Sequence, residues 1–192
     1  MANHPFDTFP WDVIKLTLTP QDAERVRVYV KERATRHAER GATPRHQCPE
    51  DNDPQGHFDM GEIAVGYHTG YEWLKDAEGD WYTDRPDIGP DDVKTTRPAR
   101  RGKREHRLWT IPEHLGKGHP QVRDRPHVLV YHMGDLDFWL MGWAWGYEIE
   151  NHGTLCNAPD RDPSLYLENH NLQSMETLCD SRPEIPGHYS LP

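Results

Sequence analysis

The chain has 192 residues, of which 32 are acidic and 22 are basic, so its formal net charge is −10. This length corresponds to about one domain, which is large enough to bury a core without disulfide support. No run approaches the roughly 18 apolar residues of a membrane-spanning helix, and the first residues lack the pattern of a signal peptide. The three cysteines are too scattered for a disulfide framework, so we expect a cytoplasmic protein.

The basic residues are distributed unevenly along the chain. Residues 94–107 hold seven basic residues and one acidic residue, which leaves the remainder strongly acidic. Such a surface repels a DNA backbone everywhere except at this one segment. The segment therefore indicates a nucleic-acid contact, and a solvated loop without a partner is the alternative interpretation.

The first predicted element is a helix over residues 20–39. Thr19 is suited to cap its N-terminus, Pro20 suits the first helical position, and Gly41 marks its end. The remainder of residues 1–56 has the composition of loops.

A second helix is predicted over residues 57–69, where apolar residues recur at a spacing of three and four. Gly61 and Gly66 lie inside it, although glycine costs a helix about 1 kcal/mol relative to alanine. Glycine within a helix is most easily explained where another backbone approaches closely. We therefore expect this helix to pack tightly against a neighbour.

The second half of the chain predicts a sheet. Strands are expected around Ile88 and over residues 93–96, 108–111, 127–132 and 136–145, followed by a short helix or turn over 146–151. The order of helices and strands indicates a single α/β (α+β) domain of residues 1–192 with a central mixed β-sheet. Its core spans residues 57–150, and residues 151–192 form an irregular C-terminal tail.

The chemically informative segment reads Pro86-Asp87, four further residues, and then Asp92-Val93-Lys94. The intervening residues contain a turn signal, so we expect a tight hairpin that brings Asp87 beside Asp92. Strand alternation then places Asp92 and Lys94 on one face. Two neighbouring carboxylates repel each other, and a divalent cation removes that cost. Hard oxygen ligands favour Mg²⁺ or Mn²⁺.

These residues resemble the motif of the PD-(D/E)XK nuclease superfamily, which has the restriction-endonuclease-like fold. In that superfamily a glutamate on the helix before the hairpin often completes the site, and Glu62 matches it here. The resemblance covers about residues 57–178. Within the superfamily, the chain is similar to members encoded by phages and mobile elements. It implies a central mixed sheet flanked by helices.

The resemblance also implies an activity, which is Mg²⁺- or Mn²⁺-dependent hydrolysis of DNA phosphodiester bonds. It assigns the catalytic roles to Glu62, Asp87, Asp92 and Lys94. The implied metal ligands are Glu62, Asp87, Asp92 and the carbonyl of Val93. Many members act as dimers, which leaves a homodimer open.

DNA is the expected partner, and no membrane is expected. Phosphate contacts supply affinity without sequence choice, and basic or hydroxyl-bearing side chains next to a metal site are suited to make them. The predicted nucleic-acid-binding residues are Thr95, Thr96, Arg97, Arg100, Arg101, Lys103, Arg104 and Arg107.

Other interpretations stay open at this point. The acidic residues and Lys94 are also compatible with a surface salt-bridge ladder, and Asp84 or Asp91 is an alternative to one of the assigned acids. A nuclease fold that binds nucleic acid without cleaving it is one alternative function. An acidic protein that mimics DNA is another, and the basic segment argues against it.

Overall fold

The computed structural model describes residues 12–39, 56–73, 87–97, 108–110, 123–156 and 164–181. Its centre is a four-stranded mixed sheet in the order β1-β5-β4-β2, formed by Ile14–Thr17 (β1), Asp137–Trp145 (β5), Pro126–Gly134 (β4) and Asp92–Thr96 (β2). β2 runs parallel to β4, and the other neighbours are antiparallel.

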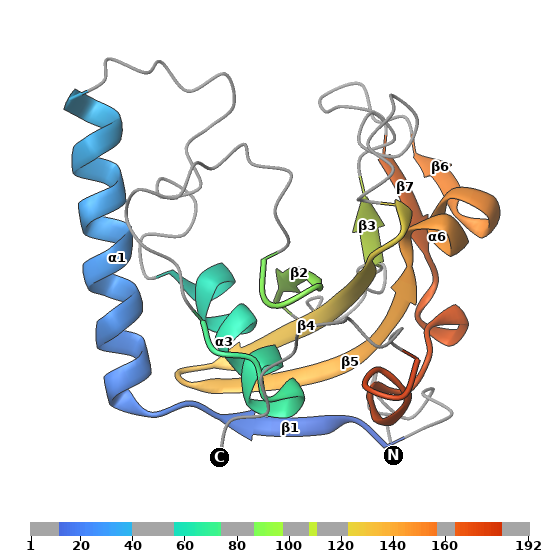
Figure 1. The fold of residues 1–192 in the computed structure, drawn as a ribbon, viewed down its shortest axis with the longest axis horizontal. Coiled ribbons are helices and arrows are strands. Elements are labelled where there is room, and N and C mark those ends of the chain that lie inside the picture. The colour runs from blue at the N-terminus through green and yellow to red at the C-terminus, as the bar shows by residue number, and fades with distance from the viewer. Residues whose placement is uncertain are drawn as a thin grey trace, which may run out of the picture.

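Three helices pack against this sheet, namely Pro20–Glu39 (α1), His57–Thr69 (α3) and Gly146–His152 (α6). α3 lies across the sheet beside β2 and β4, and α1 lies on the outer side of α3 (Figure 1). The expected α/β architecture with a mixed sheet is therefore confirmed, and both long predicted helices have the predicted bounds.

The central strands are buried along most of their length because both of their faces are covered. In β4, Val128 and Val130 belong to the cluster packed against α1 and α3, whereas Leu129 and Tyr131 belong to a second cluster with Ile149 of α6. A strand buried on both faces has a continuous apolar run instead of an alternating one. The aromatic run in β5 has the same cause, with Phe138 and Trp143 facing the α3 side.

The N-terminal cap of α1 has the predicted residues. Asp22 N donates to the Thr19 hydroxyl at 3.2 Å, and the Thr19 backbone N–H donates to the Asp22 carboxylate at 2.9 Å. Tyr67 of α3 donates from its hydroxyl to the same carboxylate at 2.7 Å. Partial burial raises the pKa of Asp22, but the hydrogen bonds from Thr19 and Tyr67 outweigh it, so the pKa is lowered overall. The same bond raises the pKa of Tyr67.

Three parts of the sequence differ from the expectation. The N-terminal segment contributes β1, which was not predicted although its four residues alternate between apolar and polar, and which pairs with β5. The segment around Ile88 forms a single backbone bridge to Asp91 instead of a strand.

The tail, expected to be irregular, is the third difference. It contributes Thr154–Cys156 (β6) and Ser164–Leu167 (β7), which join Leu108–Thr110 (β3) in a second antiparallel sheet in the order β3-β7-β6. These strands are short and are separated by polar, proline-containing segments, so their composition is that of loops. The tail ends in two short 3₁₀ turns, Asn169–Asn171 and Met175–Thr177.

These turns are anchored to the main sheet through Trp143. The Trp143 indole N–H donates to the Ser174 carbonyl at 3.0 Å, and the backbones of Trp143 and Gln173 exchange hydrogen bonds. Leu172, Met175 and Leu178 are buried, so this part of the tail packs on the core. Within the described residues, no helix is both long and apolar enough to cross a bilayer.

The Tyr67 hydroxyl supplies a pH-dependent link between α1 and α3. We expect Tyr67→Phe to raise the pKa of Asp22 and to lower the free energy of unfolding by no more than about 1 kcal/mol, because Tyr67 is 54% exposed. A lowered carboxyl pKa stabilises the fold above the ordinary pKa of 3.8, and the contribution is lost as the pH falls through the folded-state value.

The difference between wild type and Tyr67→Phe should therefore be present at neutral pH and absent in acid, as measured by chemical denaturation. Tyr147→Phe is the matched control, because it removes another partly exposed phenol away from this cap. An equal difference at both pH values would contradict the assignment.

Candidate functional site

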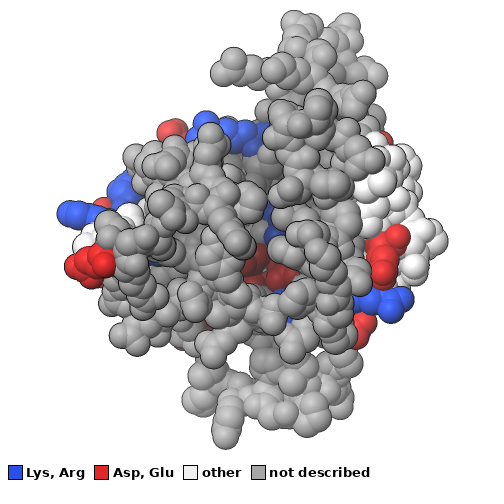
Figure 2. Space-filling view, turned by 90° about the horizontal axis from the view of Figure 1, so that it is seen from above, with Lys and Arg blue, Asp and Glu red and all other residues white. Residues whose placement is uncertain are grey.

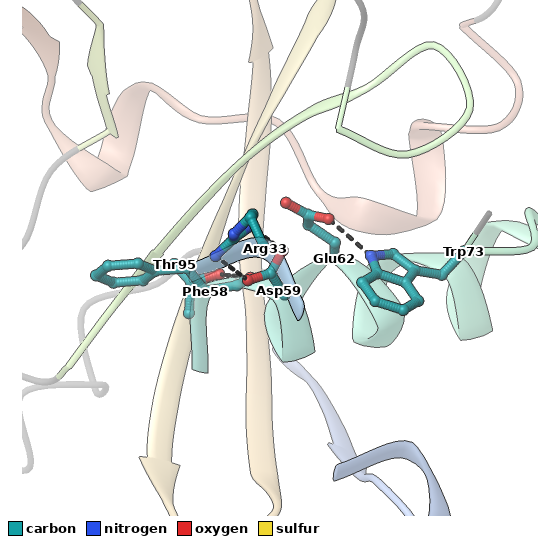
Figure 3. Close-up of polar contacts among 6 residues, drawn as sticks. All are labelled: Arg33, Phe58, Asp59, Glu62, Trp73 and Thr95. Carbon is teal, nitrogen blue, oxygen red and sulfur yellow. Dashed lines mark hydrogen bonds and ion pairs between the residues drawn. The ribbon is translucent and has the colours of Figure 1, made fainter. Parts of the chain in front are cut away.

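The contact between α3 and β2 positions the candidate site. Gly61 of α3 faces Thr95 of β2, and a Cβ on Gly61 would overlap the Thr95 side chain. The Thr95 hydroxyl donates to the Phe58 carbonyl at 3.3 Å in the first turn of α3 (Figure 3). The glycine therefore allows the close approach that the sequence predicted, although the neighbour is a side chain.

Glu62, the predicted helix glutamate, is buried and is held by an indole. Its Oε2 accepts a hydrogen bond of 2.9 Å from Nε1 of Trp73, and the two residues are 6% and 4% exposed (Figure 3). The indole is fixed in turn by α1, where Tyr29 packs edge-on and the Arg25 guanidinium lies over the ring. Glu62 is thus part of the packing between α1 and α3 and is not a solvent-facing helix residue.

Asp87 lies at the turn that leads into β2. Ile88 and Asp91 exchange two backbone hydrogen bonds of 3.1 and 2.9 Å, which close the turn around Gly89 and Pro90. Asp87 then accepts from the backbone N–H of Val93 at 2.7 Å. The carboxylate of Asp87 is therefore fixed at the start of β2, where the sequence predicted it to lie beside Asp92.

Asp92 is enclosed by two residues from the beginning of β4. Its Oδ1 lies 3.5 Å from Nη1 of Arg125, and its Oδ2 lies 3.7 Å from Nε2 of His127. The side chains of Asp92 and Arg125 are each 12% exposed, and His127 is 1% exposed. Neither Arg125 nor His127 was predicted from the sequence as a site residue. The signal that the sequence contains is an arginine and a histidine on either side of Pro126, immediately before an apolar run.

The register of β2 separates its side chains between the two faces of the sheet. Val93 is aligned with Val128, and both belong to the cluster that α3 covers. Asp92 and Lys94 are aligned with His127 and Leu129, and aligned neighbours share a face of the sheet. Asp92 and Lys94 therefore share the face away from α3, and Lys94 is exposed.

Glu62 belongs to α3, which covers the opposite face of β2, the face of Val93 and Thr95. Asp91, which the sequence left open as an alternative acid, immediately precedes β2 and is fully buried. It is thus a second buried carboxyl next to the predicted motif.

We tested whether these residues fit a metal ion. Among the described residues, no group of three or more His, Cys, Asp or Glu side chains is arranged to hold one, so Glu62, Asp87 and Asp92 do not form a three-ligand centre. Mg²⁺ usually keeps several waters and needs only one or two protein carboxylates together with substrate phosphate. Asp87 and Asp92, which lie on either side of the turn into β2, supply that smaller number of carboxylates.

The predicted DNA-contacting residues are only partly described. Thr95 faces α3, whereas Thr96 and the exposed Arg97 continue β2 beyond Lys94, and Arg97 Nη2 lies 3.5 Å from Nδ1 of His57. Figure 2 shows acidic and basic side chains together near the centre of this view. The remaining predicted contacts lie outside the described residues, namely Arg100, Arg101, Lys103, Arg104 and Arg107.

A second buried ion pair lies at the N-terminal end of α3. Arg33 of α1 lies 3.4 Å from Asp59, with both side chains less than a tenth exposed, and its guanidinium also lies over the Tyr29 ring. Next to it, the rings of His57 and His132 stack at 4.1 Å. Sequence spacing gave no signal for these contacts, because they join residues from different elements.

Comparison of the chain with models of known families, with curated proteins and with solved structures found no match. The arguments about function therefore depend on the residues and their geometry.

The close contact of α3 with β2 predicts that Gly61→Ala is destabilising. The added Cβ would overlap the Thr95 hydroxyl oxygen and lie 3.0 Å from the Thr95 methyl carbon. Such overpacking costs about 1–3 kcal/mol, from which a helix gain of about 1 kcal/mol is subtracted. Thr95→Ala removes the hydroxyl and methyl groups that overlap. We therefore expect the double variant to be more stable than the sum of the single changes predicts, as measured by chemical denaturation. Strict additivity would contradict the contact.

Proposed function

We propose that this protein is a Mg²⁺- or Mn²⁺-dependent nuclease of the PD-(D/E)XK type that hydrolyses DNA phosphodiester bonds. The observation that carries the proposal is the hydrogen bond of 2.7 Å from the Val93 N–H to Asp87. It brings the first acid of the motif to the strand that bears Asp92, Val93 and Lys94. The resemblance leads us to expect the first acid of the motif beside this strand.

Asp87 and Asp92 are the proposed metal ligands, together with the carbonyl of Val93. When bound, the cation would supply a Lewis acid and lower the pKa of a bound water. Lys94 is exposed and shares a face with Asp92, so its ammonium group is available to the negative charge that develops on the phosphate. Glu62 lies on the α3 side, where Trp73 fixes its position, and is not among the proposed ligands.

DNA is the proposed substrate because positive charge follows the acidic head of β2. Lys94 and Arg97 are exposed, and the basic residues that continue this segment lie outside the described ranges. Together they supply phosphate contacts that do not depend on sequence. The proposal includes no specificity element.

Cleavage of labelled DNA with Mg²⁺ or Mn²⁺ tests this function. We expect Lys94→Ala and Asp92→Asn to lower the rate by on the order of 10²–10⁴, the range for a lost catalytic group, and EDTA to abolish cleavage. Lys31→Ala is the matched control, since it removes an exposed lysine from α1 and should leave the rate unchanged. Equal cleavage by wild type, Lys94→Ala and Asp92→Asn would refute the assigned site.

The ion pair of Asp92 with Arg125 supports a second candidate, a nuclease-fold protein that binds DNA without cleaving it. In such a protein, the guanidinium of Arg125 takes the place of the metal ion beside Asp92. Removal of the opposing charge of a buried pair is strongly destabilising, so such a pair can be kept for the fold alone.

Calorimetric titration with Mn²⁺ and salt-dependent DNA binding discriminate between the two functions. The nuclease binds Mn²⁺, and Asp92→Asn weakens that binding, whereas the binding module binds DNA at low salt and no Mn²⁺. A protein that binds neither is compatible with none of these functions.

A further inference from the structure

Both oxygens of the Asp92 carboxylate face groups from one short segment. Arg125 Nη1 lies 3.5 Å from Oδ1, and His127 Nε2 lies 3.7 Å from Oδ2. The two residues flank Pro126 at the start of β4, and His127 is the register partner of Asp92. The position of this carboxylate is therefore set by β4 and not only by its own strand.

The Arg125 backbone is itself fixed. Its carbonyl accepts a hydrogen bond of 2.9 Å from the N–H of Gly146, the first residue of α6. Two residues earlier, Arg123 pairs with Glu150 of α6 at 2.8 Å. The segment thus connects the head of β2 to α6, and the guanidinium of Arg125 is presented to Asp92 from a rigid support.

We propose that Arg125 is a positioning residue for Asp92 and the internal cation with which a divalent metal ion must compete. This inference rests on the proposed function, because it concerns a proposed ligand of that site. The guanidinium neutralises Asp92 while no metal ion is bound and keeps its carboxylate at the edge of the sheet.

The physical reason is the burial of the pair. Two charges with side chains only 12% exposed interact more strongly than surface charges, since less water screens them. A divalent cation that approaches Asp92 is therefore repelled by the guanidinium of Arg125, which lies beside the same carboxylate. Arg123 does not have this effect on Asp92, because its half-exposed guanidinium pairs with Glu150 of α6 instead.

Mn²⁺ binding to the metal-free full chain, followed by the loss of the free-ion electron paramagnetic resonance signal, tests the inference. We expect Arg125→Gln to bind Mn²⁺ on the order of tenfold more tightly than wild type, because the competing charge is gone. Arg125→Lys should remain close to wild type, and Arg123→Gln, the matched control, should not change the affinity. A merely structural arginine would lower the melting temperature without raising the affinity for Mn²⁺. An Arg125→Gln protein that binds Mn²⁺ no more tightly than wild type overturns the competition.

A double-mutant cycle of Arg125→Gln with Asp92→Asn, measured by denaturation without metal, separates this inference from the proposed function. Non-additive changes support the pairing of Arg125 with Asp92, and additive changes overturn it. If neither wild type nor Arg125→Gln binds Mn²⁺, the metal-dependent function and the competition both fail. The cycle then decides whether Arg125 positions Asp92.

Discussion

The parallel register of β2 on β4 is the constraint on which the candidate site depends. It aligns Asp92 with His127 and Val93 with Val128, so one strand presents an acid to one face and an apolar side chain to the other. A shift of one residue would move Asp92 to the α3 side and Val93 away from the core. The contact of Gly61 with Thr95 holds the same register from α3. The packing of the core and the placement of the predicted catalytic side chains therefore have one physical origin.

Much of the fold was accessible from the sequence where a local signal was strong. The cap at Thr19 defined the start of α1, and the apolar run that became β5 was long enough to be recognised without alternation. Gly61 was interpreted as a point of close approach, and the structure shows what approaches it. The turn at Gly89 was also predicted, but the strand around Ile88 is only one bridge, because a turn signal does not specify how far pairing continues.

The candidate site was less predictable, because its contacts join residues that are far apart in the sequence. The pairing of Asp92 with Arg125 depends on the adjacency of β2 and β4, and a single sequence does not state which strands are neighbours. The three acids of the motif were expected to converge. In the structure, Asp87 is bonded to the Val93 N–H, next in the chain to Asp92, while Glu62 lies on α3 and is held by Trp73. The sequence correctly predicted that Asp92 and Lys94 share one face of β2. It did not indicate which of the two faces of β2 is covered by α3.

The charges along β2 suggest how binding and cleavage are related in the proposed function. The strand begins with the carboxylate of Asp92, continues with the exposed ammonium group of Lys94, and is followed by the exposed guanidinium of Arg97. A DNA backbone along this strand would be attracted at its end and repelled at its beginning, unless a positive charge neutralises Asp92. Arg125 supplies one such charge, and a divalent cation would supply another. A neutralised Asp92 is sufficient for DNA to bind, whereas hydrolysis also requires a Lewis acid, which a guanidinium is not. The same strand therefore suits a binding protein while Arg125 holds the carboxylate and a nuclease only when a metal ion competes successfully for it.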